Sequence, residues 1–452
     1  MSNERSGFSS RLGFVLATAG SAVGLGNIWR FPYLAAKYGG GTFLLTYLIL
    51  TLTFGFSLMI TEVALGRKAG TSAIRAFGHF SKKHTFIGYL TTIIPFIIFP
   101  YYCVIGGWVT KYALISLQGG IHNAASDTFF TGFISKSAEP MICVLVFLIA
   151  TTVVVAGGVK GGVERVSTIM MPVLIVLLIG VSLFCITRPG AMAGVAYYLK
   201  PSLKGFGPTT ILAALGQLFY SMSLAMGIMI TFGSYMPKKA DLEKSVTQVE
   251  IFDTGVAFLA GLMIVPAVFV FSNGDSSMLA KGPSLMFVML PKVFNSMAFS
   301  SVIAAVFFIL VLLAALTSSI SLLETLVAVL MDKFHMKRGT ACITMFIIAL
   351  LLAVPSSLGF GAWSNITILG FDFLDFFDFL TNSVMMPIAA IATCLLISRV
   401  VGTKKIEEEV LQEGGTFRRK RIFNFMIQYL CPIFAAIILF SSVANAFGWI
   451  SM

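Results

Sequence analysis

The feature that most constrains this chain is a succession of long apolar segments separated by short polar ones. A helix needs about 20 apolar residues to cross a bilayer. Of the 452 residues, 57% are apolar and 11% are charged, whereas soluble domains carry about 25% charged residues. The sequence therefore predicts an all-α polytopic membrane protein, one transmembrane domain over residues 1–452 with eleven spans. The expected spans are 11–36, 42–65, 86–116, 141–156, 166–187, 210–235, 246–272, 299–330, 340–354, 371–398 and 422–448.

The placement of Lys and Arg predicts how these spans are oriented. Well over twice as many of the 31 basic residues fall on the side that shares the N-terminus as on the other side. Since basic residues concentrate in cytoplasmic loops, we expect a multi-pass protein of the cell membrane with a cytoplasmic N-terminus and an extracellular C-terminus. The net charge of +12 then reflects topology and not nucleic-acid binding. The charged run 404–421 is interpreted as a solvated cytoplasmic loop that touches anionic membrane lipid.

Two of the expected spans are interrupted by small and polar residues. Span 1 contains Gly20, Gly24, Gly26 and Asn27 near its middle, and span 6 contains the segment 217–227. Five spans separate the interruptions, which indicates a 5+5 inverted repeat with spans 1–5 over about 11–187 and spans 6–10 over about 210–398. An unwound helix in hydrocarbon frees polar backbone groups, so it survives where it lines a cavity or an ion. A simple glycine packing face would explain only the glycines.

Several motifs carry a resemblance to a known family. They are Arg11-Leu-Gly through Phe31-Pro, Gly39-Gly-Gly-Thr-Phe, Glu62-x-x-x-Gly66-Arg67, Ala214-Leu-Gly-Gln217 and Thr317-Ser-Ser319. Together they resemble the sodium-coupled amino-acid and neurotransmitter symporters, over spans 1 to 10. The resemblance implies a non-enzymatic symporter that imports neutral, mainly hydrophobic L-amino acids with two sodium ions and no organic cofactor. A proton-coupled or exchange-type carrier of the same fold is the alternative.

The resemblance also implies two sodium sites. Spacing supports one of them independently, because residues 314, 317 and 318 lie on one helix face and an all-oxygen shell suits a hard cation. For Thr317 and Ser318 alone, bonding to the backbone of their own helix is the simpler interpretation. The family's ligands at that site correspond to Gly20, Val23, Ala314, Thr317 and Ser318. Those at the other site correspond to Ala22, Asn27, Ser221 and Asp253.

Asp253 departs from the family pattern, which has Asn at this position. Animal members require chloride, held near a Ser four residues further along, and here that position is Ala257. One negative charge is thus built into the chain, so the sequence predicts transport that does not need chloride.

The family's substrate site maps onto residues without charged side chains, which implies an apolar amino acid. Its carboxylate is expected at the Leu25 and Gly26 amides and at the Tyr102 hydroxyl. The full set of expected substrate-binding residues is Ala22, Leu25, Gly26, Ile98, Tyr102, Tyr220, Ser221, Ser223, Met226, Ser321 and Leu322.

Other residues correspond to gates and hinges of the family. Arg30 and Asp378 resemble an outer gate pair, because charges at mid-membrane need partners. Glu62 resembles the carboxylate that accepts from amides of the broken helices. The remaining positions are Arg5, Asp332 and Tyr235 at an inner gate, with Phe8 where many members have Trp, and Gly162 and Pro172 at a segment of span 5 that unwinds.

Other function classes fit the sequence less well. A channel would use pore-lining rings or a filter, whereas this chain has two dissimilar broken spans. No His-Glu metal pair and no Gly-x-Ser-x-Gly elbow occurs, which argues against an intramembrane enzyme. A receptor of the same fold remains open, and nothing in the sequence specifies an oligomeric state.

Overall fold

The computed structural model of the chain describes residues 7–202, 206–272 and 284–449, and in these ranges the regular structure is helical apart from one isolated bridge, Ile368 to Phe371. Nine of the helices described there are long and apolar enough to cross a membrane. They are Gly41–Ala69 (α3, η2, α4), Lys82–Leu117 (η3, α6), Ala138–Ala156 (α9), Val159–Ile186 (η4, α10), Leu242–Phe271 (α14), Ser300–Phe334 (α16), Arg338–Leu358 (α17), Phe373–Val401 (α18, η7, α19, η8) and Lys420–Ala446 (α21, η10, α22). The prediction of an all-helical membrane protein is confirmed.

The two interrupted windows appear as broken helices. Arg11–Ala22 (α1) and Gly26–Lys37 (η1, α2) are bent by 56° and together are long enough to cross once. The window 210–235 corresponds to Pro208–Ser221 (α12) and Ile228–Tyr235 (α13), which are 14 and 8 residues long. Each is shorter than a bilayer span, so neither is long enough to cross a membrane by itself.

The long helices expose apolar side chains that a soluble protein would bury. Val153 on α9, Val176 on α10 and Leu351 on α17 are 65–67% exposed, although each lies within a long apolar helix. Side chains of this kind cost nothing when they face lipid. A few helices begin at a side-chain cap, as at Asp241, whose side chain accepts from the Lys244 amide at the start of α14.

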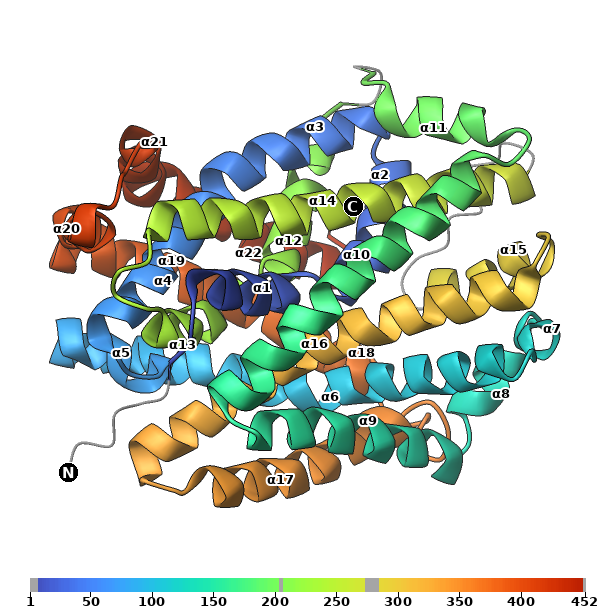
Figure 1. Cartoon of the computed structure of the whole chain (residues 1–452), viewed down its shortest axis with the longest axis horizontal. Coiled ribbons are helices and arrows are strands. Elements are labelled where there is room, and N and C mark those ends of the chain that lie inside the picture. The colour runs from blue at the N-terminus through green and yellow to red at the C-terminus, as the bar shows by residue number, and fades with distance from the viewer. Residues whose placement is uncertain (1–6, 203–205, 273–283, 450–452) are drawn as a thin grey trace.

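The broken helix α1 lies at the centre of the molecule (Figure 1). It packs against α10, α14 and α16, and α16 runs beside α6. One end of the molecule carries the short helices α5 (Ala73–Phe80), α20 (Thr403–Val410) and α21 (Lys420–Phe425). The opposite end carries α7 (Ile121–Ala124), α8 (Phe129–Ile134), α11 (Ala191–Leu199) and α15 (Leu290–Asn295).

The charged run 404–421 is not simply a solvated loop. Its helix α20 buries Ile406 and Val410. Glu409 is buried as well and forms an ion pair with Arg67 at the end of α4, with Nε to Oε1 at 2.8 Å and both side chains 1% exposed. A buried guanidinium requires a charged partner, because leaving it alone costs several kcal/mol. The run therefore closes over the end of α4.

Candidate functional site

Both helix breaks involve backbone that is not helical, at positions close to each other in space. Helix α1 ends at Ala22, and Val23 is extended with φ −74° and ψ 101°. Between α12 and α13, Ser223 and Ala225 adopt positive φ values of 52° and 60°. Such conformations cost about 1–3 kcal/mol each at non-glycine residues, so surrounding contacts must impose them. The Ala225 amide donates to Glu62 Oε1 at 2.8 Å, the contact that the family resemblance implies for Glu62.

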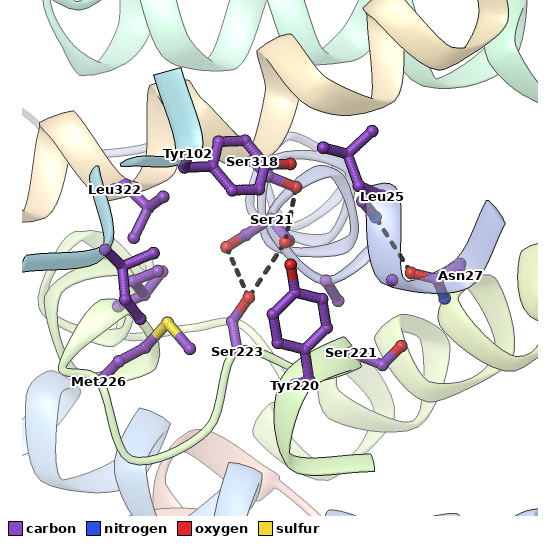
Figure 2. Close-up of a pocket in the computed structure, with 15 residues that line it drawn as sticks. Ser21, Leu25, Asn27, Tyr102, Tyr220, Ser221, Ser223, Met226, Ser318 and Leu322 are labelled. Atoms are coloured by element: carbon purple, nitrogen blue, oxygen red, sulfur yellow. Dashed lines mark hydrogen bonds between the residues drawn. The ribbon is translucent and has the colours of Figure 1, made fainter. Parts of the chain in front are cut away.

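A small cavity of about 40 Å³ lies between the two breaks (Figure 2). Residues of the breaks form most of its wall, and α6 and α16 complete it. Its lining residues are Ser21, Ala22, Gly24, Leu25, Gly26, Asn27, Ile98, Tyr102, Tyr220, Ser221, Ser223, Met226, Ile228, Ser318 and Leu322. None of these carries a charged side chain.

Ten of the eleven residues expected at the substrate site line this cavity. The eleventh, Ser321, is buried outside the lining and donates to the Thr317 carbonyl at 3.0 Å. A serine inside a membrane helix is satisfied by its own backbone in this way. Sequence reasoning missed Ser21, Gly24 and Ile228. Of these three, only Gly24 was indicated by the sequence, because it belongs to the interruption of span 1.

Polar atoms gather on one side of the cavity. The Ser223 hydroxyl donates to the Ser21 carbonyl at 3.0 Å, and the Ser318 hydroxyl donates to the same oxygen at 3.1 Å (Figure 2). The Tyr102 hydroxyl is buried and has no hydrogen-bond partner in the described part of the chain. A buried hydroxyl without a partner is costly, so Tyr102 is available to donate to a ligand.

Three side chains converge on Asp253, which is fully buried in α14. Asn27 Nδ2 donates to Asp253 Oδ1 at 2.8 Å, and Ser221 Oγ donates to the same oxygen at 2.7 Å. The Tyr47 hydroxyl donates to Oδ2 at 3.1 Å. The amide of Asn27 also holds the first break, because its Oδ1 accepts from the Gly24 amide at 3.0 Å. The structure thus brings together three of the four residues assigned to one sodium site, and adds Tyr47, which the sequence did not indicate.

The other proposed ion site lies where α1 touches α16. Ser318 Oγ lies 3.5 Å from the Gly20 carbonyl oxygen and 3.3 Å from that of Val23. Thr317 Oγ1 donates to the Ala314 carbonyl at 3.0 Å. Gly20 permits the approach, since a Cβ there would lie 3.2 Å from the Thr317 Cβ. All five assigned residues therefore place neutral oxygen atoms in one region.

Charged ligands are scarce around these oxygens. The residues that the structure describes contain no group of three or more His, Cys, Asp or Glu side chains that could hold a metal ion. A shell of carbonyl and hydroxyl oxygens suits a hard monovalent cation better than a transition metal.

The two residues of the expected outer gate are not paired in this structure. The Arg30 guanidinium lies 5.3 Å from the centroid of the Tyr220 ring. Asp378 accepts from Asn382 Nδ2 at 2.6 Å and from the Tyr101 hydroxyl at 3.3 Å. Each charge is thus compensated by a neighbour, the cation by an aromatic face and the carboxylate by amide and hydroxyl donors. Their role as a gate stays a prediction.

The expected inner gate includes contacts that sequence reasoning missed. The Tyr235 hydroxyl donates to Glu324 Oε1 at 2.7 Å, and Arg338 forms an ion pair with Glu324 at 2.6 Å. Asp332 Oδ2 accepts from the Ser72 amide at 2.6 Å. Phe8 packs edge-on against Tyr235, with ring centroids 6.0 Å apart. Arg5, the remaining member of the gate, lies outside the described residues.

Comparison with known proteins identifies the family. The profile described as "Sodium:neurotransmitter symporter family" matches residues 5–131 and 130–448. The chain belongs to this family. Uncharacterized sodium-dependent transporters of Bacillus subtilis (YhdH) and Haemophilus influenzae are 35% and 33% identical to it, over 96% and 97% of this chain and 96% and 98% of theirs. A crystal structure of MhsT in complex with L-phenylalanine is 37% identical, covers 97% of this chain and 100% of that one, and superposes with a TM-score of 0.87.

Membership in the sodium:neurotransmitter symporter family establishes the broad activity. The chain is a multi-pass membrane transporter that couples the movement of a small-molecule substrate to sodium. The resemblance drawn from the motifs between Arg11 and Ser319 is therefore confirmed at the level of the family.

The segment that is expected to unwind contains a glycine at which no residue with a Cβ would fit. Gly162 lies in η4 (Val159–Glu164), where a Cβ would approach the Val154 carbonyl oxygen to 1.9 Å. Pro172 lies inside α10 (Arg165–Ile186). The carboxylate of Glu164 accepts from the Ser9 amide at 2.8 Å and from its hydroxyl at 2.5 Å. The N-terminal segment is thus tied to the start of α10.

Proposed function

We propose that this transporter is a sodium symporter that imports neutral, mainly hydrophobic L-amino acids by alternating access. The observation that carries the proposal is the cavity between the two breaks, whose lining has no charged side chain. An acidic or basic side chain would be desolvated there without a partner, which is unfavourable. Apolar contacts from Ile98, Met226 and Leu322 suit an apolar side chain instead, and the flexible Met226 adapts to its shape.

The polar side of the cavity suits the backbone of an amino acid. The Leu25 and Gly26 amides begin the second half of the broken helix, where the helix dipole favours a carboxylate. The unpartnered Tyr102 hydroxyl adds a donor on this side. The carbonyls of Ala22, Tyr220 and Ser221 and the Ser223 hydroxyl offer acceptors for the ammonium group.

Two sodium ions are proposed, one in each oxygen cluster. The first is held by Ala22, Asn27, Ser221 and Asp253 and contacts the substrate carboxylate. The second is held by Gly20, Val23, Ala314, Thr317 and Ser318. Direct contact between the first ion and the substrate makes their binding cooperative, and each then raises the affinity of the other by the same factor.

Asp253 gives this chain a fixed negative charge at the first ion. The carboxylate is buried and already carries three donors, so it lies where a cation would be stabilised. The hydroxyl at which animal members hold chloride is replaced by the buried Ala257. We propose that Asp253 replaces the anion and that transport does not require chloride.

For the membrane arrangement we propose eleven spans, with α12 and α13 forming the sixth and the two breaks related by a 5+5 inverted repeat. The N-terminus lies in the cytoplasm and the C-terminus outside. Inward opening releases the second sodium ion when the segment from Gly162 to Pro172 unwinds, with Arg5, Tyr235 and Asp332 closing the inner side and Arg30 and Asp378 the outer side.

The proposal is tested by uptake into proteoliposomes. Radiolabelled phenylalanine, leucine, glutamate and lysine are offered with an inward sodium gradient, or with potassium in place of sodium. We expect accumulation of phenylalanine and leucine only with sodium, and none of glutamate or lysine. A proton gradient that drives the same uptake without sodium would favour the proton-coupled alternative.

A further inference from the structure

A second pocket lies outside the transport pathway, at the end of the molecule that carries α5. Its volume is about 490 Å³, and it is formed by the end of α4, the turn that follows, α5, the start of α6 and the end of α16. The residues that line it are Ala69, Thr71, Ile74, Arg75, Gly78, His79, Thr85, Tyr89 and Lys333. None of them takes part in the substrate site or in the two ion clusters.

The pocket is strongly basic. Arg75, His79 and Lys333 contribute side chains to its wall, and none of the described lining residues is Asp or Glu. Neither Arg75 nor Lys333 forms an ion pair with any carboxylate among the residues that the structure describes. Two positively charged side chains thus face one hollow, and the carboxylate next to Lys333 in the chain, Asp332, accepts from the Ser72 amide.

Lys333 is held in place by an aromatic neighbour. Its Nζ donates to the Tyr89 hydroxyl at 3.0 Å and lies 4.2 Å from the centroid of the same ring. Only one of the three ammonium protons is used in this way. The Thr71 hydroxyl is buried at the pocket wall and has no hydrogen-bond partner in the described ranges. Donors therefore remain for a ligand that accepts several hydrogen bonds.

Exposed aromatic side chains surround the pocket. Tyr89 is 43% exposed and Phe86 58% exposed on the first turns of α6, and Phe334 is 60% exposed at the end of α16. Aromatic residues at the ends of membrane helices mark the level of the lipid headgroups. The pocket consequently opens at the membrane surface and not into bulk water.

We propose that this pocket binds the phosphate group of an anionic membrane lipid. Guanidinium and ammonium groups are the usual partners of phosphate oxygens, and basic pockets between membrane helices bind lipid headgroups. A soluble phosphate would offer the same oxygens but would leave the aromatic rim without an acyl chain. The site is independent of the proposed substrate and links α5 to α6 and α16.

Native mass spectrometry of the full-length protein tests the site. Protein is released from nanodiscs of phosphatidylcholine containing one-fifth phosphatidylglycerol, and the retained phosphatidylglycerol is counted. Arg75→Gln with Lys333→Gln is expected to lower retention by about tenfold or more. Lys82→Gln with Lys83→Gln removes the same charge from exposed positions of η3 (Lys82–His84), between α5 and α6 and outside the pocket, and should retain the wild-type amount. Equal loss in both double variants, or no loss in the first, would overturn the proposal.

A second arm separates the lipid from a soluble anion and also reports on folding. The thermal unfolding midpoint is measured in pure phosphatidylcholine nanodiscs, with phosphatidylglycerol added, or with sodium phosphate against sodium chloride of the same ionic strength. Phosphatidylglycerol should raise the midpoint of the wild type and of the Lys82 and Lys83 control but not of the Arg75 and Lys333 variant. All three should unfold alike in pure phosphatidylcholine. If sodium phosphate raised the wild-type midpoint as much, the lipid would be ruled out as the source of the phosphate.

Discussion

The two oxygen clusters beside the broken helix α1 differ in how they are built. The cluster at Asp253 contains a buried carboxylate with three donors, two of them from the helix breaks at Asn27 and Ser221. The cluster at Thr317 and Ser318 contains only neutral hydroxyls and carbonyls. The first is therefore an electrostatic site, and the second depends on geometry alone.

This difference has a consequence for coupling. In the proposed arrangement the substrate touches the ion at Asp253 and does not touch the ion at Thr317. A change at the first site should alter sodium and substrate together, whereas a change at the second should alter sodium alone. The charge at Asp253 makes the first site the more sensitive of the two.

The largest effect is expected from Asp253→Asn, which keeps the shape and removes the charge. Opposite charges a few ångströms apart attract by several kcal/mol even at an effective dielectric of about 20. Sodium-driven uptake should fall by about a hundredfold or more. Initial uptake rates measure the effect, and Asp253→Glu serves as the control that keeps the charge. Partial recovery of Asp253→Asn by chloride is expected when Ala257→Ser is added.

Asn27→Ala should weaken sodium and substrate together. It removes the donor to Asp253 and the acceptor that holds the Gly24 amide, and a hydrogen bond to a charged group contributes about 1.5–3 kcal/mol. Phenylalanine binding at a series of sodium concentrations should show both dissociation constants raised by about tenfold or more. An effect on sodium alone would contradict the shared site.

Thr317→Ala should weaken sodium without changing the affinity for substrate at saturating sodium. One neutral ligand is lost, so the sodium concentration for half-maximal uptake should rise by about fivefold. Ser319→Ala is the matched control, because its hydroxyl faces Thr151 at 2.9 Å and not α1. Wild-type sodium dependence in Thr317→Ala would contradict the assignment of a second sodium site at Thr317.

The smallest effect is expected at the unwinding segment. Pro172→Ala restores a backbone donor inside α10 and so favours the wound helix. Turnover should fall by about threefold while equilibrium phenylalanine binding stays the same. Pro355→Ala, in the interior of α17, is the control. Unchanged turnover in Pro172→Ala would show that inward opening does not depend on unwinding of this segment.

The sequence predicted the helices well because an apolar window reports directly on a membrane span. The expected ends of spans 3 and 5, at 86–116 and 166–187, differ by one residue from the α-helical parts α6 (Thr85–Leu117) and α10 (Arg165–Ile186). The continuous helices begin earlier, at Lys82 and Val159. The break between α12 and α13 was placed only roughly. Of its three residues with positive φ, only Gly227 is a glycine. No local signal in the sequence therefore indicates the left-handed conformation of Ser223 and Ala225.

The site was predicted only where residues belong to a motif. Tyr47 was missed because a tyrosine in an apolar window is indistinguishable from packing. The contact between Ser9 and Glu164 spans 155 positions and exists only in the folded chain. Glu324 could have been found, because a carboxylate in the interior of a long apolar segment needs a partner, and Arg338 is that partner.

Replacing chloride by gluconate tests the role of Asp253 most directly. Sodium-driven phenylalanine uptake is measured in proteoliposomes with chloride or gluconate on both sides, for the wild type and for Asp253→Asn. We expect equal wild-type uptake in the two anions and little uptake by Asp253→Asn in gluconate. A wild-type protein that stops transporting in gluconate, or an Asp253→Asn variant with full activity there, would show that this carboxylate does not supply the charge.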